Sequence, residues 1–443
     1  MAVNVQTPPD SMYRSTEGLG VWEHKGKVAA VGIGVSPTAR RWDESPETSV
    51  GAWTILAIRN AMEDAGVSPE EVDGIVLTPD TSTGVSWPKD RPIPESFVET
   101  FNLTDDPLDG IVKLSVEWIL KNMPELTNIK FAMHAPTCMS NAIVVGAQAV
   151  GDGMTQTCLV VRGWHNLAGR YYVGQGAAGM DTIAGPAGIT SGHGVPACGT
   201  TAMMFQEYCH KYGKNHDMMA NFVITEKRNG LLLPEGYWAQ HRPEDLTVED
   251  YLAARWIAKP ANLYDKDLPI CVSAAFVFTT AERAKDMKQK PVYILNHTRT
   301  TPKHRGAVQT LDDWQEAADE TGRKLYEGAG IKNTDLSFEN MYDGFTEFHQ
   351  FHLEGLRFAG VGRGEALDFY QTDISVEGPN PISPSGGNVG SGRSRFWMHT
   401  DCIQQIQNRA GPRQITGVKP EIGVSGGPMP VGGDYTVWGS SPD

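Results

Sequence analysis

Cys138 is a candidate nucleophile of this sequence. It precedes a predicted helix over residues 141–150 and follows His134 by four positions. A helix N-terminus favours the thiolate form of a cysteine, and a neighbouring histidine can do the same. Cys138 and His134 are therefore compatible with covalent acyl transfer. A second interpretation stays open, because unpaired cysteines are often small apolar side chains packed inside a core.

Tyr342 and Asp343 form a second candidate pair, between a predicted strand and the helix that follows it. The turn reads Tyr342-Asp343-Gly344-Phe345-Thr346. A phenol can protonate or deprotonate an alcohol oxygen if its pKa, ~10 in water, is lowered locally. Tyr342 is thus a candidate base or proton relay, with Asp343 as the residue that orients it. The alternative is a tyrosine that closes the turn by bonding its hydroxyl to the backbone.

The remaining histidine and glycine motifs give weaker signals. His349 and His352 are three residues apart on one predicted helix face, which suits a metal, but no third ligand lies near them in the sequence. Gly32-x-Gly34 lacks the rest of a dinucleotide fingerprint, and the sequence has no Gly-x-x-x-x-Gly-Lys phosphate loop. We therefore expect no metal and no permanently bound cofactor such as NAD or ATP.

Composition and charge exclude several classes of protein. The chain has 443 residues, a length that predicts two or three core units. Hydrophobic residues are 40% and charged residues 21% of the chain, a balance typical of globular proteins. Its net charge of −15 is unfavourable for binding nucleic acid or an anionic membrane. No run approaches the ~18 apolar residues of a membrane span, and residues 1–22 lack an apolar signal-peptide core. The six cysteines show no Cys-x-x-Cys spacing, so we expect a soluble protein of the reducing cytoplasm.

Two halves of the chain repeat one pattern. Residues 325–331 match residues 61–67 without a gap, and the same displacement along the chain carries Val28 onto Val292, inside the apolar run 291–295. Each half reads as strand, long helix, short helix and strand, followed by another helix–strand pair. So long a displacement indicates a duplicated domain rather than a solenoid. The alternation of strands and helices predicts an α/β fold.

The repeat divides the chain into predicted units. They are an N-terminal extension (1–27), half one (28–163 and 268–290), an insertion (164–267), half two (291–433) and a C-terminal tail (434–443). A structureless loop as long as the insertion is improbable in a compact protein. We therefore expect the insertion to be ordered and to lie over the active face.

Several phrases resemble the thiolase superfamily, in its sterol carrier protein x and lipid-transfer branch. In chain order they are Ala61–Gly66, Glu226–Asn229, Leu246–Ala253, Leu263–Pro269, Thr280–Ala284 and Tyr342–Thr346. The order and spacing of the phrases are more specific than any single one. The resemblance implies a duplicated thiolase-like fold with five layers, α-β-α-β-α, and chemistry where helix N-termini of the two halves converge. Helix N-termini stabilise thiolates and developing oxyanions.

Three positions depart from the thiolase pattern. The thiolase nucleophile would fall near Pro136, two residues before Cys138. The loop Gly386–Ser394 carries Arg393 where a thiolase has the histidine of a Gly-His-Pro phrase, and the stretch Val424–Pro428 has no second cysteine. Two of the three proton-handling groups of a thiolase are thus absent, which argues against ordinary thiolysis.

Tyr342 stands where thiolases of this branch have the histidine of a His-Asp pair, and this is similar to the aldolases that cleave steroid side chains. The resemblance therefore implies a carbon–carbon lyase for retro-aldol cleavage of a bulky, steroid-like or aromatic β-hydroxyacyl-CoA, with coenzyme A as part of the substrate. Two alternatives stay open: a non-standard thiolase or C-acyltransferase that uses Cys138, and an acyl-CoA-binding subunit without chemistry. The resemblance also implies a homodimer core that works with a small zinc-ribbon/OB-fold partner protein.

Overall fold

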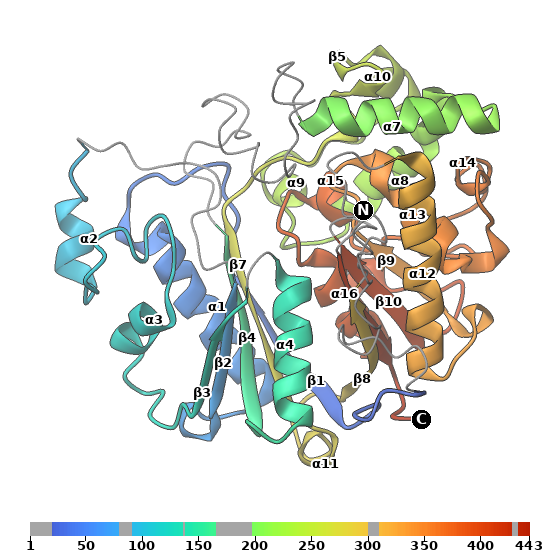
Figure 1. Cartoon of the computed structure of the whole chain (residues 1–443). Helices are drawn as coiled ribbons and strands as arrows, with labels where there is room; N and C mark the ends of the chain where they lie inside the picture. Colours follow the sequence, from blue (N-terminus) through green and yellow to red (C-terminus); the bar gives the residue numbers. More distant parts are fainter. Residues whose placement is uncertain (1–19, 79–90, 136–137, 165–196, 300–309, 428–432) are drawn as a thin grey trace, which may run out of the picture.

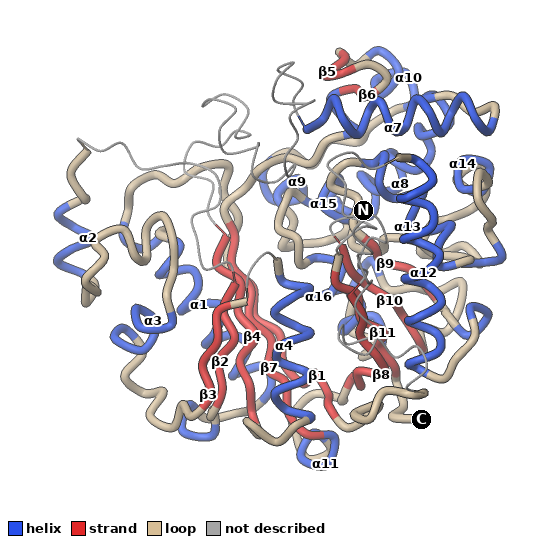
Figure 2. The backbone as a smooth tube through the Cα atoms, viewed as in Figure 1, coloured by secondary structure: helices blue, strands red, loops and turns tan. Residues whose placement is uncertain are grey.

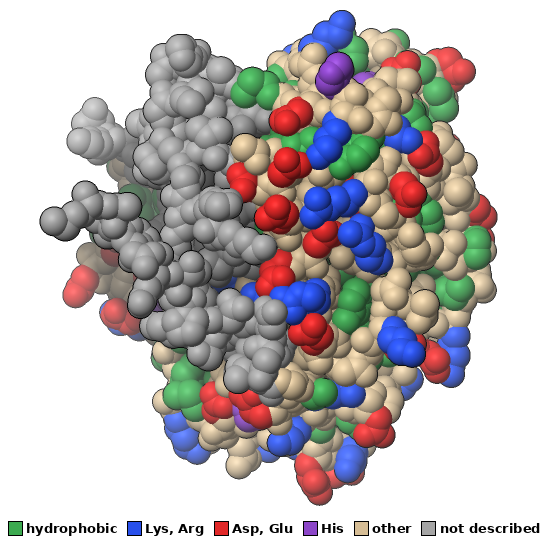
Figure 3. Space-filling view, turned by 45° about the vertical axis from the view of Figure 1, so that its right-hand side comes forward, with side chains coloured by type: hydrophobic (Ala, Val, Ile, Leu, Met, Phe, Trp, Pro, Cys, Tyr) green, Lys and Arg blue, Asp and Glu red, His purple; other side chains and the backbone are tan. Residues whose placement is uncertain are grey.

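The computed structural model describes residues 20–78, 91–135, 138–164, 197–299, 310–427 and 433–443. Within these ranges nine strands form one mixed sheet, and helices cover both of its faces (Figures 1 and 2). None of the helices in the same ranges is long and apolar enough to cross a membrane. Lys, Arg, Asp and Glu side chains are interspersed over the face drawn in Figure 3.

The large sheet has two parts that meet at a short seam. The first part has the order β3 (Phe131–His134), β2 (Gly74–Thr78), β4 (Thr157–Trp164), β7 (Val272–Thr280) and β1 (Val28–Val35). The second part continues with β8 (Val292–Arg299), β11 (Asp434–Gly439), β10 (Ile422–Gly427) and β9 (Phe338–Met341). Two residue pairs, Ala29 with Tyr293 and Ala30 with Val292, join β1 to β8. From this seam the two parts diverge and leave room for helices between them (Figure 1).

The helices and the two sheet parts together make five layers. Helices α4 (Met139–Gly151) and α16 (Trp397–Ile406) lie between the two parts (Figure 1). Helix α1 (Val50–Ala65) covers the outer face of the first part. Helices α12 (Leu311–Ala329) and α13 (Thr346–Leu356) cover the outer face of the second part. The predicted α-β-α-β-α arrangement is confirmed.

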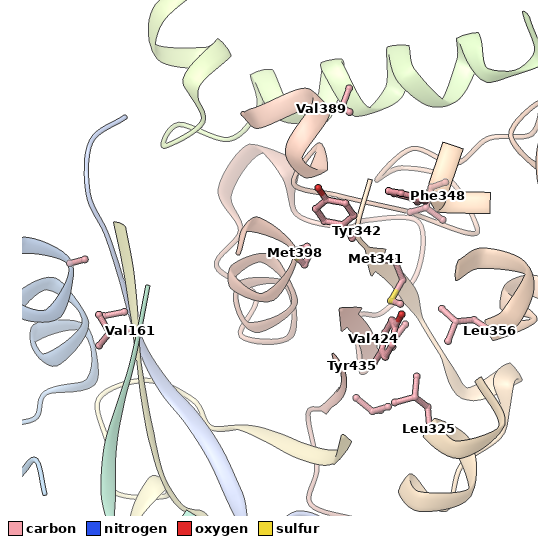
Figure 4. Close-up of a cluster of buried hydrophobic side chains, with 14 of the residues drawn as sticks. Val161, Leu325, Met341, Tyr342, Phe348, Leu356, Val389, Met398, Val424 and Tyr435 are labelled. Atoms are coloured by element: carbon pink, nitrogen blue, oxygen red, sulfur yellow. The ribbon is translucent and has the colours of Figure 1, made fainter. Parts of the chain in front are cut away.

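The buried core follows the same layers. One cluster joins α4 and α16 to the inner faces of both sheet parts, and includes Met139, Ile143 and Ile403. A helix that buries apolar side chains on nearly all sides belongs inside a fold rather than on its surface. The second cluster packs the outer helices against the sheet, and Figure 4 shows its part around Met341 and Val424.

The predicted repeat also relates elements of the two halves in space. Gly66 and Gly330 are separated by a fixed number of residues along the chain. The same separation relates the first and last residues of β1 to those of β8, and the first residue of β2 to the first residue of β9. Helices α1 and α12 both end at a glycine in the left-handed conformation, with φ of 71° at Gly66 and 64° at Gly330. Glycine adopts this conformation without the steric cost that a Cβ atom imposes. The same stop signal therefore ends the long helix of each half.

The other helices lie outside the five layers. They are α2 (Glu95–Thr100), α3 (Val116–Asn122), α7 (Ala197–Tyr212), α8 (Ala220–Leu231), α9 (Tyr237–His241), α10 (Val248–Ala253), α11 (Ala281–Ala284), α14 (Ala366–Phe369) and α15 (Gly387–Ser391). A small second sheet pairs β5 (Trp256–Ala258) with β6 (Ala261–Asn262). The segment from α7 to α10 lies above the second half in Figure 1. The described part of the predicted insertion is thus ordered, whereas residues 165–196 lie outside the described residues.

The two ends of the chain differ from the predicted extension and tail. Residues 434–443 are not a tail, because they contain β11, a fully buried strand between β8 and β10. The sequence analysis missed this strand because the Gly- and Pro-rich stretch before it, 426–433, is typical of the end of a domain. At the other end, the Trp22 side chain is buried against His297, and its backbone N–H bonds to the Gly328 carbonyl. Residues next to β1 therefore pack on the second half.

Candidate active site

Tyr342 lies where strand β9 ends and its chain turns toward α13. Its side chain is buried, and its backbone N–H bonds to the Gly426 carbonyl of β10 at 2.9 Å. Figure 4 shows the Tyr342 hydroxyl turned away from Met341 and Val424 of the core cluster. The backbone of two neighbouring parallel strands thus fixes the base of the phenol, while its polar end leaves the apolar core.

Asp267 is the carboxyl group that faces the Tyr342 phenol. A β-carbon placed on Gly344 would lie 2.2 Å from the Tyr342 hydroxyl oxygen and 2.5 Å from Oδ2 of Asp267. The two oxygens therefore meet over a bare glycine, which any side chain at position 344 would disturb. The phenol and the carboxyl thus face each other across position 344.

The electrostatics of this pair disfavour the phenolate form of Tyr342. Burial, followed by the negative charge of Asp267, raises the pKa of Tyr342 above its ordinary value. The condition for a phenolic base, a locally lowered pKa, is therefore not met, because an anionic neighbour and loss of water both oppose a phenolate. Burial also raises the pKa of Asp267 to about 7.

Two arginines partly offset these unfavourable effects. Arg393 and Arg395 lower the pKa of both Asp267 and Tyr342, as a positive charge near an acid does. Arg393 is buried, and its backbone N–H bonds to the Leu268 carbonyl at 2.8 Å, next to Asp267 in the chain. This loop, where we expected a thiolase histidine to be replaced by Arg393, thus supplies positive charge to the pair.

A backbone bridge brings Asp267 to the Tyr342 turn. Lys266 pairs with Phe345 as an isolated β-bridge, and the Asp267 N–H bonds to the Gly344 carbonyl at 3.0 Å. A buried ion pair joins the same segments, with Lys266 Nζ 2.6 Å from Glu347 Oε1. Burial of both ends makes such a pair sensitive to the loss of either partner.

Asp343 does not orient the phenol, contrary to our expectation. Its carboxylate accepts hydrogen bonds from the N–H groups of Asn388 and Val389, each at 2.7 Å, and from the Asn388 side chain at 3.0 Å. Burial and the charge of Asp343 raise the pKa of Glu226 well above its ordinary value. Asp343 therefore holds the loop of α15 in place, and Asp267 is the carboxyl that faces Tyr342.

Cys138 lies on the other side of the end of β10. It is the N-cap residue of α4, its side chain is buried, and its Sγ lies 4.0 Å from the Gly427 carbonyl oxygen. Tyr342 contacts the preceding residue, Gly426, so the structure brings Cys138 and Tyr342 to one place. The N-terminus of α4 there offers backbone N–H groups and a partial positive charge.

His134 is not brought to Cys138. It is exposed at the end of the edge strand β3, and its Nε2 accepts a hydrogen bond from the Val116 N–H at 3.4 Å. Nearness in sequence was misleading here, because the strand directs the ring toward the start of α3. The suggested pairing of His134 with the thiol is therefore wrong in this structure.

His399 is the histidine that the structure places near Cys138 along α4. Its Nε2 lies 2.8 Å from Ser140 Oγ and its Nδ1 lies 2.7 Å from Ser425 Oγ. Burial, with a smaller effect of the Arg162 charge, lowers the pKa of His399 to about 3. A neutral imidazole thus links α4, α16 and β10.

The histidine pair on α13 is occupied by other contacts. His349 lies between the Tyr370 hydroxyl at 2.7 Å and Glu339 Oε2 at 3.1 Å. His352 packs edge-on against the ring of Tyr435. Among the residues that the structure describes, no group of three His, Cys, Asp or Glu side chains could hold a metal ion.

Asp267 and Arg395 are the site residues that our sequence analysis missed. Asp267 lies in the phrase Leu263–Pro269, which carried part of the resemblance but no assigned role. An acidic residue inside a recognised phrase was the available signal, although its approach to Tyr342 depends on a bridge between distant segments.

Known proteins similar to this chain are thiolase-like proteins and aldolases. The family model for thiolase C-terminal domain-like proteins matches residues 300–429. A 17-hydroxy-3-oxo-4-pregnene-20-carboxyl-CoA lyase of Mycobacterium tuberculosis is 26% identical over 376 residues, which cover 82% of this chain and 87% of that protein. A steroid side-chain-cleaving aldolase of Thermomonospora curvata is 26% identical over 380 residues, which cover 82% and 86%.

Solved structures agree with the sequence relatives. An Ltp2-ChsH2(DUF35) aldolase has a TM-score of 0.73 with this chain at 20% identity, and the match covers 94% of this chain and 98% of that one. Human mitochondrial 3-ketoacyl-CoA thiolase has a TM-score of 0.60 at 12% identity, covering 94% and 100%. These matches confirm the predicted fold class and the predicted resemblance.

The first prediction concerns the charge of Asp267. Between its ordinary value of 3.8 and its folded pKa of about 7, the folded protein keeps a proton that the unfolded chain has released, so wild-type stability falls as pH rises. Asparagine does not titrate. The stability of wild type should therefore fall relative to that of Asp267→Asn as the pH rises. The difference between their free energies of unfolding should change by up to ~4 kcal/mol from about pH 4 to about pH 8, at ~1.4 kcal/mol for each pKa unit.

Urea unfolding of both proteins across this pH range measures the difference. Because the other buried acids titrate equally in both proteins, the difference isolates Asp267. A difference that stays constant with pH would show that burial does not raise the pKa of this carboxyl.

Proposed function

We propose that this chain, a thiolase-superfamily protein of the lipid-transfer branch, is a carbon–carbon lyase that performs retro-aldol cleavage of a β-hydroxyacyl-CoA. The observation that carries the proposal is the buried Tyr342 phenol facing Asp267 beside two arginines, where a thiolase needs a histidine and a second cysteine. The named activities of the Mycobacterium tuberculosis and Thermomonospora curvata relatives support the same reaction class.

Retro-aldol cleavage needs a group that takes the proton of the β-hydroxyl and a group that stabilises an enolate. Tyr342 is our proton relay for the hydroxyl, because its oxygen leaves the apolar core and meets a carboxyl group. As the Cα–Cβ bond breaks, the β-carbon becomes a carbonyl and the rest of the acyl-CoA becomes an enolate. The N–H groups at the start of α4 and the charge of Arg393 or Arg395 would stabilise the enolate oxygen.

A bulky acyl group is the substrate class that we propose, with coenzyme A as part of the substrate. One relative is a lyase of a pregnene-20-carboxyl-CoA and another cleaves steroid side chains. A steroid-like ring system, or an aromatic one of similar bulk, is therefore our first choice for the group that leaves as a ketone or aldehyde. We further propose that the enzyme acts in the cytoplasm and without a bound cofactor.

The direct test uses Tyr342→Phe, which removes one hydroxyl and almost no volume. Wild type should release a ketone or aldehyde from a steroidal β-hydroxyacyl-CoA, detectable by mass spectrometry. The variant should lose ~100-fold or more in kcat with little change in KM, because the deficit belongs to the transition state. Its stability should fall by at most ~1 kcal/mol. Near-normal turnover by folded Tyr342→Phe would remove Tyr342 from the mechanism.

Acyl transfer through Cys138 is the second candidate function, favoured by the position of its thiol at the N-terminus of α4. It requires a covalent acyl-Cys138, and intact-mass measurement after mixing with acyl-CoA would detect this adduct. Under our proposal Cys138→Ala keeps most of the lyase activity, because the thiol forms no bond to substrate. Loss of activity in folded Cys138→Ala, together with an acyl adduct in wild type, would favour acyl transfer instead.

We also propose that a homodimer of this chain works with a small zinc-ribbon/OB-fold partner. The similar solved structure is named an Ltp2-ChsH2(DUF35) aldolase, which supports an assembly of this kind. We expect the chain purified alone to turn over substrate poorly and to gain activity when the partner is added. Full activity of the homogeneous chain would contradict the need for a partner, and binding without turnover in the complete assembly would favour a non-catalytic subunit.

A further inference from the structure

We infer that Asp267 is the final acceptor of the proton that leaves the substrate hydroxyl, and that the Tyr342 phenol passes this proton on. The inference rests on the proposed retro-aldol function and assigns the base within it. Asp267 acts through Tyr342, so it is a positioning and proton-holding residue rather than a group that contacts substrate.

The first support is the geometry around Gly344. Tyr342 and Asp267 approach from different segments, and the space between their oxygens is kept open by a residue without a side chain. The Tyr342 hydroxyl and Asp267 Oδ2 both lie close to this one position, at 2.2 and 2.5 Å from a β-carbon placed on Gly344, which is the juxtaposition that a relay needs. Both groups are buried, so bulk water does not compete for the proton.

The second support is the charge balance of the groups that face the pair. Arg393 and Arg395 favour an ionised Asp267, whereas burial and the negative charge of Asp343 oppose it. The result is a carboxyl pKa of about 7, at which both of its protonation states are accessible near neutral pH. The pKa of Tyr342 is raised, so a resting phenolate is unfavourable. The carboxylate is therefore the anion that can accept the proton.

The third support is the attachment of Asp267 to the turn. Its N–H bonds to the Gly344 carbonyl, and Lys266 beside it forms the buried ion pair with Glu347. Asp265 is held as well, by Thr346 Oγ1 at 3.1 Å. A relay needs its two groups at a fixed separation, and one backbone hydrogen bond together with two buried side-chain contacts fixes it here.

The step balances without an outside acid or base. The substrate O–H bond breaks and its proton passes to the Tyr342 oxygen, while the phenol proton passes to Asp267. The Cα–Cβ electron pair moves into the thioester enolate, and the β-carbon becomes a carbonyl. The proton on Asp267 then returns through Tyr342 to the enolate α-carbon, which restores the phenol, the carboxylate and a neutral acyl-CoA.

The test compares pH profiles of wild type and Asp267→Asn with a β-hydroxyacyl-CoA substrate. Wild-type kcat/KM should rise with pH, with its midpoint near about pH 7 and a plateau above it, because the carboxylate is the working form and kcat/KM reports the enzyme without substrate. Asp267→Asn should lose ~100-fold or more in kcat with little change in KM, and its residual rate should lack the rise near about pH 7. A purely structural Asp267 would change stability and leave the shape of the profile intact.

Two further variants separate the relay from general damage. Gly344→Ala keeps both functional groups but places a methyl group between them, so kcat should fall by ~10-fold or more in a protein that still unfolds cooperatively. Asp434→Asn is the matched control. Asp434 is another buried carboxyl with a raised pKa, about 6, but it faces Arg299 and Asn141 rather than Tyr342. This control should keep the wild-type turnover and pH profile.

The outcomes distinguish the two proposals. If wild type assembled with its partner protein releases no ketone or aldehyde, the retro-aldol function fails and the relay with it. If wild type cleaves the substrate but Asp267→Asn and Gly344→Ala turn over normally, the relay is overturned and the function stands. A rise near about pH 7 that disappears in Asp434→Asn and persists in Asp267→Asn would also overturn it. Should Asp267→Asn fail to fold, Gly344→Ala decides on the same criteria.

Discussion

The buried ion pair between Lys266 and Glu347 joins the insertion to the turn that carries Tyr342. Charges in a protein interior require a partner, because the loss of water costs each ion several kcal/mol. The pair therefore forms only when the segment before β7 and the start of α13 are in register, as their β-bridge requires. This contact holds Asp267, the next residue after Lys266, beside Gly344. The Asp267 carboxyl then lies close to the Tyr342 hydroxyl.

Burial then determines how the pair can react. In an ordinary thiolase-like site a helix N-terminus and an imidazole support a thiolate, whereas here a phenol and a carboxyl share a buried site. Both have raised pKa values, and Arg393 and Arg395 limit the rise. Such a site suits the transfer of a proton from an alcohol better than the attack of an anion on a thioester. The Cys138 thiol nevertheless lies near the end of β10.

The sequence predicted the features that depend on local patterns. The apolar runs, the glycines that end α1 and α12, and the repeat that relates the two halves all follow from helix and strand periodicity. The site was less accessible. Tyr342 follows its strand directly and could be recognised, but Asp267 reaches it through a contact between distant segments. His134 was assigned by its nearness to Cys138, although a strand end and a helix start four residues apart can face different ways.

A structure with a bound, unreactive β-hydroxyacyl-CoA analogue tests the account most directly. We predict that the β-hydroxyl lies within hydrogen-bond distance of the Tyr342 oxygen, with Asp267 on the far side of the phenol and the thioester oxygen at the N-terminus of α4. An analogue whose thioester carbon lies against Cys138 Sγ, with its β-carbon remote from Tyr342, would contradict the lyase mechanism.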